Sequence, residues 1–160
     1  MEIPSGIEGT RRTLSIMREL VKAGKVSPLV RQTAVQLTTG LNQKDWLSEV
    51  KAIHVFVRDR IRYLRDVRGV ETLHTPDRIL QNRAGDCDDK TVLLASMLET
   101  IGHPTRFVAI GFKPNQCAHV YLEVRPGNKG AWMALETTEA VEVGWSPPKS
   151  AIRKTIIAAN

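Results

Sequence analysis

The spacing of apolar residues changes once along the chain. Up to Gly102 they recur every three or four positions, which predicts amphipathic helices. After Pro104 apolar and polar residues alternate, which predicts strands. Helices followed by strands are typical of an α+β domain with an antiparallel sheet, and this is the fold class that we expect.

The helical part carries clear start and stop signals. Thr10 is a candidate N-cap for the first helix, and Ser27 followed by Pro28 for the second. A glycine follows the end of both helices. We expect helices over 9–24, 27–40 and 42–64, and a single helical turn over 75–80.

The next helix begins at Cys87 and is the most apolar in the chain, so we expect it at the centre of the fold. Asp86 is placed to cap it, and Asp89 resembles the acidic half of a capping box. Gly102 and Pro104 end this helix.

The second half predicts a small sheet. We expect strands over 105–112, 117–124 and 131–138, with a tight turn at 125–130, and the tail 151–160 reads as a short strand or helix. A length of 160 residues predicts a single domain. Within 1–160 we distinguish a helical part (1–74), a catalytic-type core (75–140) and a C-terminal tail (141–160).

The net charge of +6 raises the question of nucleic acid. The densest basic stretch places Arg58, Arg62 and Arg65 on one face of the predicted third helix. The chain has only eight aromatic residues, and none interleaves with this stretch as a base-stacking platform requires. A solvated helix face explains the arginines better, so nucleic-acid binding is not favoured.

No apolar run is long enough to span a bilayer, and the N-terminus lacks the apolar stretch of a secretory signal. We therefore expect a cytoplasmic protein without membrane association. With two cysteines, the chain has no disulfide framework, and we expect both thiols to be reduced.

The chemistry concentrates around Cys87 and one strand. Alternation along 117–124 gives an apolar face and a polar face, the latter made of Cys117, His119, Tyr121 and Glu123. We expect the polar face to meet the start of the Cys87 helix. If the strands 117–124 and 131–138 are neighbours, Glu136 can reach His119.

A thiol, an imidazole and a carboxylate in this order are the parts of a nucleophilic site. The helix N-terminus and a protonated His119 would favour the thiolate of Cys87, and the flanking aspartates would cap amides. The alternative is that Cys87 is an inert buried side chain. Cys117 is expected to be structural, and His54, His74 and His103 to be structural or solvated.

Four motifs in sequence order resemble the transglutaminase-like superfamily, a branch of the papain-like cysteine enzymes. They are Gly-Asp-Cys-Asp-Asp at 85–89, Gly-His-Pro-Thr-Arg at 102–106, His-Val-Tyr-Leu-Glu at 119–123, and Trp-Met-Ala-Leu-Glu at 132–136. The resemblance implies Cys87 as nucleophile, His119 as general base and acid, and Glu136 as the group that orients the imidazole. It departs at Glu136, where the family usually has Asp.

Other residues are candidates to line such a site. Gln81 or Asn82 could help to bind an oxyanion, since papain-like enzymes use a side-chain amide beside the cysteine amide. Tyr121 and Trp132 lie on the same strands as the candidate triad.

We expect no cofactor and no metal. Cys87, Cys117 and His119 match no common zinc spacing. Some bacterial transglutaminase-like proteinases bind calcium at a similar stretch, but the aspartates around Cys87 lack the spaced oxygens and glycine of a calcium loop.

Two functions remain open. One is a thiol enzyme that acts on amide bonds of a protein or peptide, as peptidase, amidase or acyl transferase. The other is a catalytically inactive domain of the same fold that binds an assembly partner, with a phage structural or assembly role and virion association as one form of it.

Overall fold

The computed structural model describes residues 7–66, 72–111, 118–147 and 153–159. Its helices are α1 (Ile7–Gly24), α2 (Pro28–Thr38), α3 (Trp46–Arg60), α4 (Pro76–Asn82) and α5 (Cys87–Thr100), with a 3₁₀ turn η1 (Pro126–Asn128). Its strands are β1 (Arg62–Tyr63), β2 (Ala84–Gly85), β3 (Thr105–Gly111), β4 (His119–Val124), β5 (Met133–Leu135) and β6 (Arg153–Ala158). The fold is α+β, as predicted.

The main sheet is antiparallel, with strand order β5-β4-β3-β6. Phe107 pairs with Leu122, and Leu122 with Leu135. The tail therefore supplies the strand β6, which the sequence pattern left open. A separate two-stranded pair joins β1 and β2 in parallel and was not predicted.

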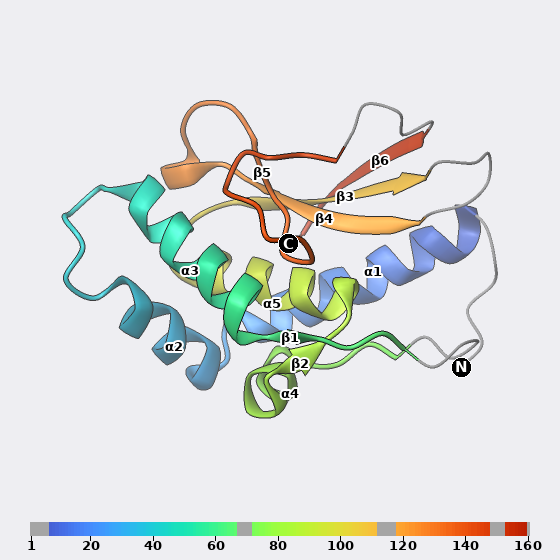
Figure 1. Cartoon of the computed structure of the whole chain (residues 1–160), viewed down its shortest axis with the longest axis horizontal. Helices are drawn as coiled ribbons and strands as arrows, with labels where there is room; N and C mark the ends of the chain where they lie inside the picture. The colour runs from blue at the N-terminus through green and yellow to red at the C-terminus, as the bar shows by residue number, and fades with distance from the viewer. Residues whose placement is uncertain (1–6, 67–71, 112–117, 148–152, 160) are drawn as a thin grey trace.

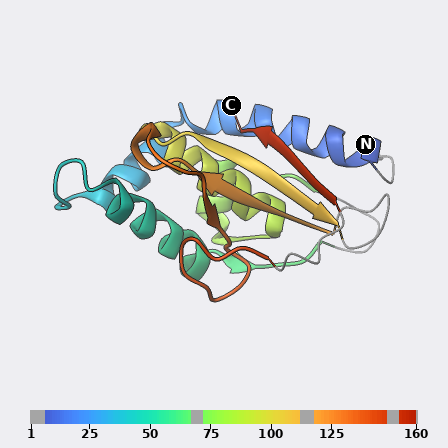
Figure 2. The same cartoon turned by 90° about the horizontal axis from the view of Figure 1, so that it is seen from above.

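Helix α5 lies at the centre, as its composition predicts. Val92, Leu93, Leu94, Met97 and Leu98 are fully buried. Figure 1 shows the sheet as a layer on one side of α5, with the other helices around it. In Figure 2 the strands cross over α5, between α1 along one side and α3 along the other. A helix that is enclosed on all sides needs apolar residues all round, which is why α5 has no strong amphipathic stripe.

The helix caps follow the sequence signals in three places. The side chains of Ser27, Thr75 and Asp86 accept from backbone N–H groups in the first turns of α2, α4 and α5. Pro28 and Pro76 occupy first-turn positions, where a missing N–H costs nothing.

Two helix boundaries differ from the prediction. Helix α1 begins at Ile7, so Thr10 lies inside it. Helix α3 is capped by Asp45 and ends at Arg60. The chain continues as β1 because Arg62 pairs with Ala84 and Tyr63 with Gly85. Arg62 consequently does not share a helix face with Arg58, which corrects the basic face inferred from the sequence.

Candidate active site

The N-terminus of α5, which carries Cys87, contacts strand β4 of the sheet. Asp86 caps the helix, and its Oδ1 accepts from the N–H of Asp89 at 3.0 Å. The Thr91 hydroxyl bonds to the carbonyl oxygen of Cys87 at 2.7 Å and lies 3.4 Å from that of Val120 in β4. The first turn of α5 therefore lies against the start of β4, where His119 precedes Val120.

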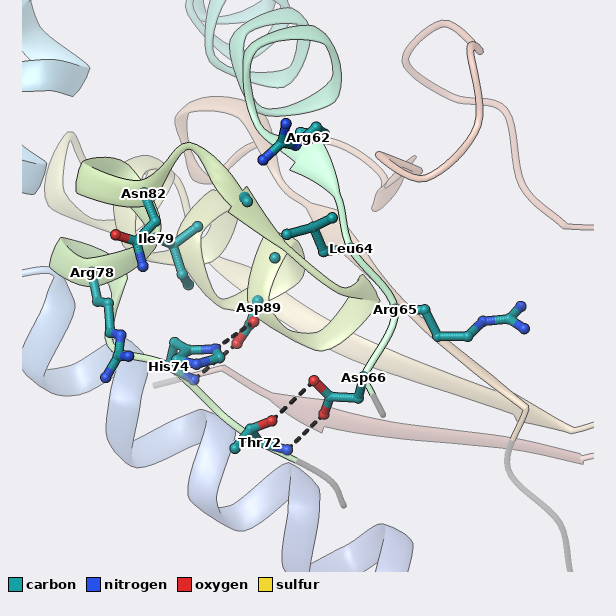
Figure 3. Close-up of a pocket in the computed structure, with 12 residues that line it drawn as sticks. Arg62, Leu64, Arg65, Asp66, Thr72, His74, Arg78, Ile79, Asn82 and Asp89 are labelled. Atoms are coloured by element: carbon teal, nitrogen blue, oxygen red, sulfur yellow. Dashed lines mark hydrogen bonds and ion pairs between the residues drawn. The ribbon is translucent and has the colours of Figure 1, made fainter. Parts of the chain in front are cut away.

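Asp89 has a different role from the one predicted. Its carboxylate is buried and accepts from the backbone N–H of His74 at 2.9 Å and from His74 Nδ1 at 2.8 Å. Figure 3 shows the two side chains pointing toward each other. Asp89 thus holds the segment before α4 instead of completing a capping box. Gly85 permits this close packing, since a Cβ there would lie 2.6 Å from the Asp89 Cβ.

The electrostatics of the Cys87 thiol differ from the expected thiolate. Burial raises its pKa, and the carboxylates of Asp88 and Asp86 raise it further, while the backbone amide of Val120 acts in the opposite direction. The thiol donates to Asp88 Oδ1 at 3.5 Å. Asp86 caps the helix as expected, but Asp88 faces the sulfur, so the surroundings of Cys87 favour the neutral thiol over the thiolate.

His119 and Glu136 form the pair that the sequence predicts. Strands β4 and β5 are neighbours, and His119 Nε2 lies 2.5 Å from Glu136 Oε2. The other carboxylate oxygen, Oε1, accepts from the N–H and the hydroxyl of Thr138, each at 2.7 Å. Burial acts to raise the pKa of Glu136, but the hydrogen bonds from His119 and Thr138 outweigh it and hold the pKa below its usual value. Glu136 is therefore an ionised, buried acceptor for the imidazole.

Tyr121, on the polar face of β4, points away from α5, so our expectation that this whole face meets the start of the Cys87 helix is wrong. Val120 and Leu122 belong to the main core, whereas Tyr121 packs in a second buried cluster on the other face of the sheet. Its ring lies 6.4 Å from the His119 ring, with 21° between the two planes. Cys117 lies outside the described residues, so its predicted structural role stays a prediction.

Trp132 lies just before β5 and is partly buried. The guanidinium groups of Arg106 and Arg125 lie 4.4 and 5.8 Å from its ring centre. Arg106 also pairs with the carboxylate of Glu123. Trp132 and Tyr121 both line a cavity of about 530 Å³ on this face of the sheet.

Gln81 and Asn82 are exposed in the last turn of α4. Asn82 lines the cavity of about 510 Å³ in Figure 3, together with His74 and Asp89. Cys87 is not among the residues that line it. The oxyanion role inferred for Gln81 or Asn82 therefore stays a prediction.

Sequence reasoning missed two residues that contact this region. His54 in α3 is fully buried, and its Nε2 lies 2.6 Å from the carbonyl oxygen of Glu136. Thr138 bonds to the Glu136 carboxylate, as described above. The 3.6-residue rhythm of α3 placed His54 correctly inside the helix, but only the packing of α3 against the end of β5 gives it this partner.

Within the described ranges, no group of three or more His, Cys, Asp or Glu side chains is arranged to hold a metal ion. In the same ranges, no helix has the length and apolar character needed to cross a membrane.

The chain matches one family model over residues 31–137, which is more than half of its length, and the family is described as the transglutaminase-like superfamily. The chain belongs to this superfamily. The match covers Cys87, His119 and Glu136 together, and ends one residue after Glu136. No curated protein sequence matches the transglutaminase-like chain closely enough to serve as a relative.

Solved structures support the same fold. A Parabacteroides distasonis chain described as a "putative protease" superposes with a TM-score of 0.62 at 15% identity, over 92% of this chain and 29% of that one. A Cytophaga hutchinsonii chain described as a "putative cysteine protease" gives a TM-score of 0.55 at 18% identity, over 80% of this chain and 45% of that one. Legionella pneumophila LapG gives a TM-score of 0.54 at 19% identity, over 81% of this chain and 75% of that one. This chain thus spans less than half of the first two, and the similarity shows the transglutaminase-like fold alone.

Proposed function

We propose that this transglutaminase-like domain is a cysteine peptidase-like enzyme that acts on amide bonds, with Cys87 as nucleophile, His119 as general base and acid, and Glu136 as the orienting carboxylate. The observation that supports it most is the 2.5 Å contact between His119 Nε2 and Glu136 Oε2, on the strand that also packs against the first turn of α5.

The contact to Glu136 fixes the tautomer that the proposed mechanism needs. A carboxylate only accepts, so Nε2 of His119 carries a hydrogen and Nδ1 of the neutral ring carries a lone pair instead of a hydrogen. Nδ1 is then the nitrogen that takes the thiol proton of Cys87. Glu136 stabilises the imidazolium that this transfer forms.

In the proposed reaction, the sulfur of Cys87 attacks the amide carbonyl carbon, and its proton passes to His119 Nδ1. As the C–N bond breaks, Nδ1–H protonates the leaving amine and a thioester remains. Water or an amine then attacks the thioester, its proton passes to Nδ1, and the C–S bond breaks as the sulfur regains the proton. In this proposal the backbone amide of Cys87 binds the oxyanion, with Gln81 or Asn82 as the second donor.

One observation favours the second candidate, an inactive module that binds an assembly partner in a virion or elsewhere. Burial and two carboxylates raise the pKa of Cys87, which is the environment of an unreactive thiol. The enzyme proposal requires His119 to overcome this by taking the proton during the attack.

Thiol labelling separates the two candidates. Iodoacetamide at pH 7 should label Cys87 faster than Cys117, which serves as the internal reference thiol. His119→Ala should slow labelling of Cys87 by about tenfold through loss of the base, while leaving Cys117 unchanged. Equal labelling of the two cysteines, or an unaltered rate in the variant, would leave the inactive module as the better proposal.

Activity is tested with a peptide mixture and an added biotinylated primary amine. New peptide N-termini indicate hydrolysis, and incorporation of biotin indicates acyl transfer, in each case absent with Cys87→Ala. If neither product forms although Cys87 is reactive, the proposed reaction on amides is wrong.

A further inference from the structure

The end of β5 depends on a hydrogen bond from outside the sheet. The pairing of β4 with β5 ends at Leu122 and Leu135, one residue before Glu136. The carbonyl oxygen of Glu136 takes its hydrogen bond from His54 Nε2 at 2.6 Å, across 82 positions of sequence. The backbone that carries the Glu136 carboxylate is therefore anchored to α3.

The chemistry of His54 is fixed by this partner. A carbonyl oxygen only accepts, so Nε2 must carry the hydrogen and His54 donates. Within the described residues, Nδ1 of His54 is buried without a hydrogen-bond partner. Burial lowers the pKa of His54, which keeps the ring neutral. An unpartnered buried nitrogen costs free energy, so a histidine here is a poor choice for packing alone.

We infer that His54 is a positioning residue for the proposed catalytic pair, and that it holds Glu136 where its carboxylate meets His119. The inference rests on the proposed roles of His119 and Glu136 and deepens them. Glu has one more methylene than the Asp usual at this position, and a longer side chain has more rotamers to restrain. Two separate anchors restrain it: Thr138 binds Oε1 of the carboxylate, and His54 binds the backbone.

If His54 only stabilised the fold, replacing it should affect the proposed site no more than replacing His103 does. His103 is also buried, with Nε2 at 2.8 Å from Glu49 and Nδ1 accepting from the N–H of Gly127 at 2.9 Å. Neither partner belongs to the proposed site. His103→Leu therefore matches His54→Leu as a variant that removes a buried, hydrogen-bonded imidazole, and it serves as the control.

The readout is the tautomer of His119, measured by nitrogen-resolved NMR of the ring at a pH where the ring is neutral. In the wild-type protein we expect the Nε2–H form to dominate, because Glu136 accepts from it. Loss of the His54 donor in His54→Leu should lower the ratio of Nε2–H to Nδ1–H by roughly three- to tenfold, the range expected for one weakened hydrogen bond. His103→Leu should leave the ratio unchanged.

His54→Gln completes the test, because its side-chain amide can still donate to the Glu136 carbonyl. We expect it to restore most of the wild-type ratio. If His54→Leu does not fold, His54→Met, which is closer in length, takes its place. An unchanged ratio without the donor, an equal change in His103→Leu, or no restoration by glutamine would each overturn the inference.

The same experiment separates this inference from the proposed function. The NMR ratio does not depend on catalysis, so an unreactive Cys87 would remove the proposed function and leave the effect of His54 on His119 measurable. A reactive Cys87 with an unchanged ratio in His54→Leu would remove only the inference about His54. If the inference holds, His54→Leu should also slow Cys87 labelling, and His103→Leu should not.

Discussion

Replacing Asp88 by Asn should make Cys87 more reactive, which is the opposite of what loss of a catalytic residue would do. The thiol donates to Asp88 Oδ1 at 3.5 Å, and this carboxylate is one cause of the raised pKa of Cys87. Asn has nearly the same shape without the charge, so the substitution removes the negative charge that opposes the thiolate.

The size of the effect follows from the separation. At 3.5 Å, two unit charges repel by about 5 kcal/mol at an effective dielectric constant of about 20 and by about 1 kcal/mol in water. Asp88 is partly exposed, so the lower end applies and the pKa of Cys87 should fall by about one unit. That raises the thiolate fraction about tenfold, while the less basic thiolate is about threefold less nucleophilic. Labelling at pH 7 should therefore become about threefold faster.

The assay compares iodoacetamide labelling of Cys87 with that of Cys117 between pH 6 and 9. Glu19→Gln is the matched control, because it removes one carboxylate from the exposed surface of α1, where Glu19 pairs with Lys22. It should not change the ratio of the two rates. A Cys87 rate in Asp88→Asn that equals the wild-type rate at every pH would refute the assignment of Asp88 as a group that suppresses the thiolate.

Three further substitutions test the surroundings of the site. Burial raises the pKa of Asp86 to about 6, so the folded state binds its proton more tightly and stability falls as pH rises from about 4 to about 6. The full shift corresponds to about 3 kcal/mol, and the partial exposure of Asp86 reduces this to about 1 kcal/mol. Asp86→Asn, which can still cap, should therefore be about 1 kcal/mol more stable than wild type in urea unfolding at pH 7 and equal to it at pH 4. Gly85→Ala should lower the free energy of unfolding by about 1–3 kcal/mol in the same measurement, because its Cβ would lie 2.6 Å from that of Asp89. An unchanged free energy of unfolding would contradict the close packing. Thr138→Val should lower the free energy of unfolding by about 0.5–1.5 kcal/mol, because the hydroxyl hydrogen bond to Glu136 is lost, whereas Thr138→Ser keeps the hydroxyl and should not lower it.

Local signals in the sequence predicted the parts of the fold that local interactions determine. Ser27 and Asp86 cap their helices because a short polar side chain reaches the N–H groups of its own first turn. The pairing of β4 with β5 was also predicted, since the turn between them is short and the alternating pattern fixes which residues share a face. The contact between His119 and Glu136 follows from that pairing.

Features that depend on distant segments could not be read from the pattern. The helical rhythm continues past Arg60, yet the chain leaves the helix because Arg62 and Tyr63 pair with residues more than 20 positions away. The sequence pattern allows the Asp89 carboxylate to complete a capping box at the start of α5. In the structure the carboxylate instead binds His74, a contact that the local pattern does not predict. The contact of His54 with the carbonyl oxygen of Glu136 likewise depends on how α3 packs, and the spacing of residues in the sequence does not predict it.

The charges around Cys87 also decide how the proposed enzyme would have to work. A helix N-terminus offers the equivalent of about half a positive charge, whereas Asp86 and Asp88 each bring up to a full negative charge to the same turn. The dipole alone therefore cannot ionise the sulfur, and burial works against it as well. A resting thiolate–imidazolium pair is not favoured, so the thiol proton must move to His119 as the sulfur attacks. In the proposed mechanism, catalysis then depends on the contact between His119 and Glu136, and the rate should fall when either residue is replaced.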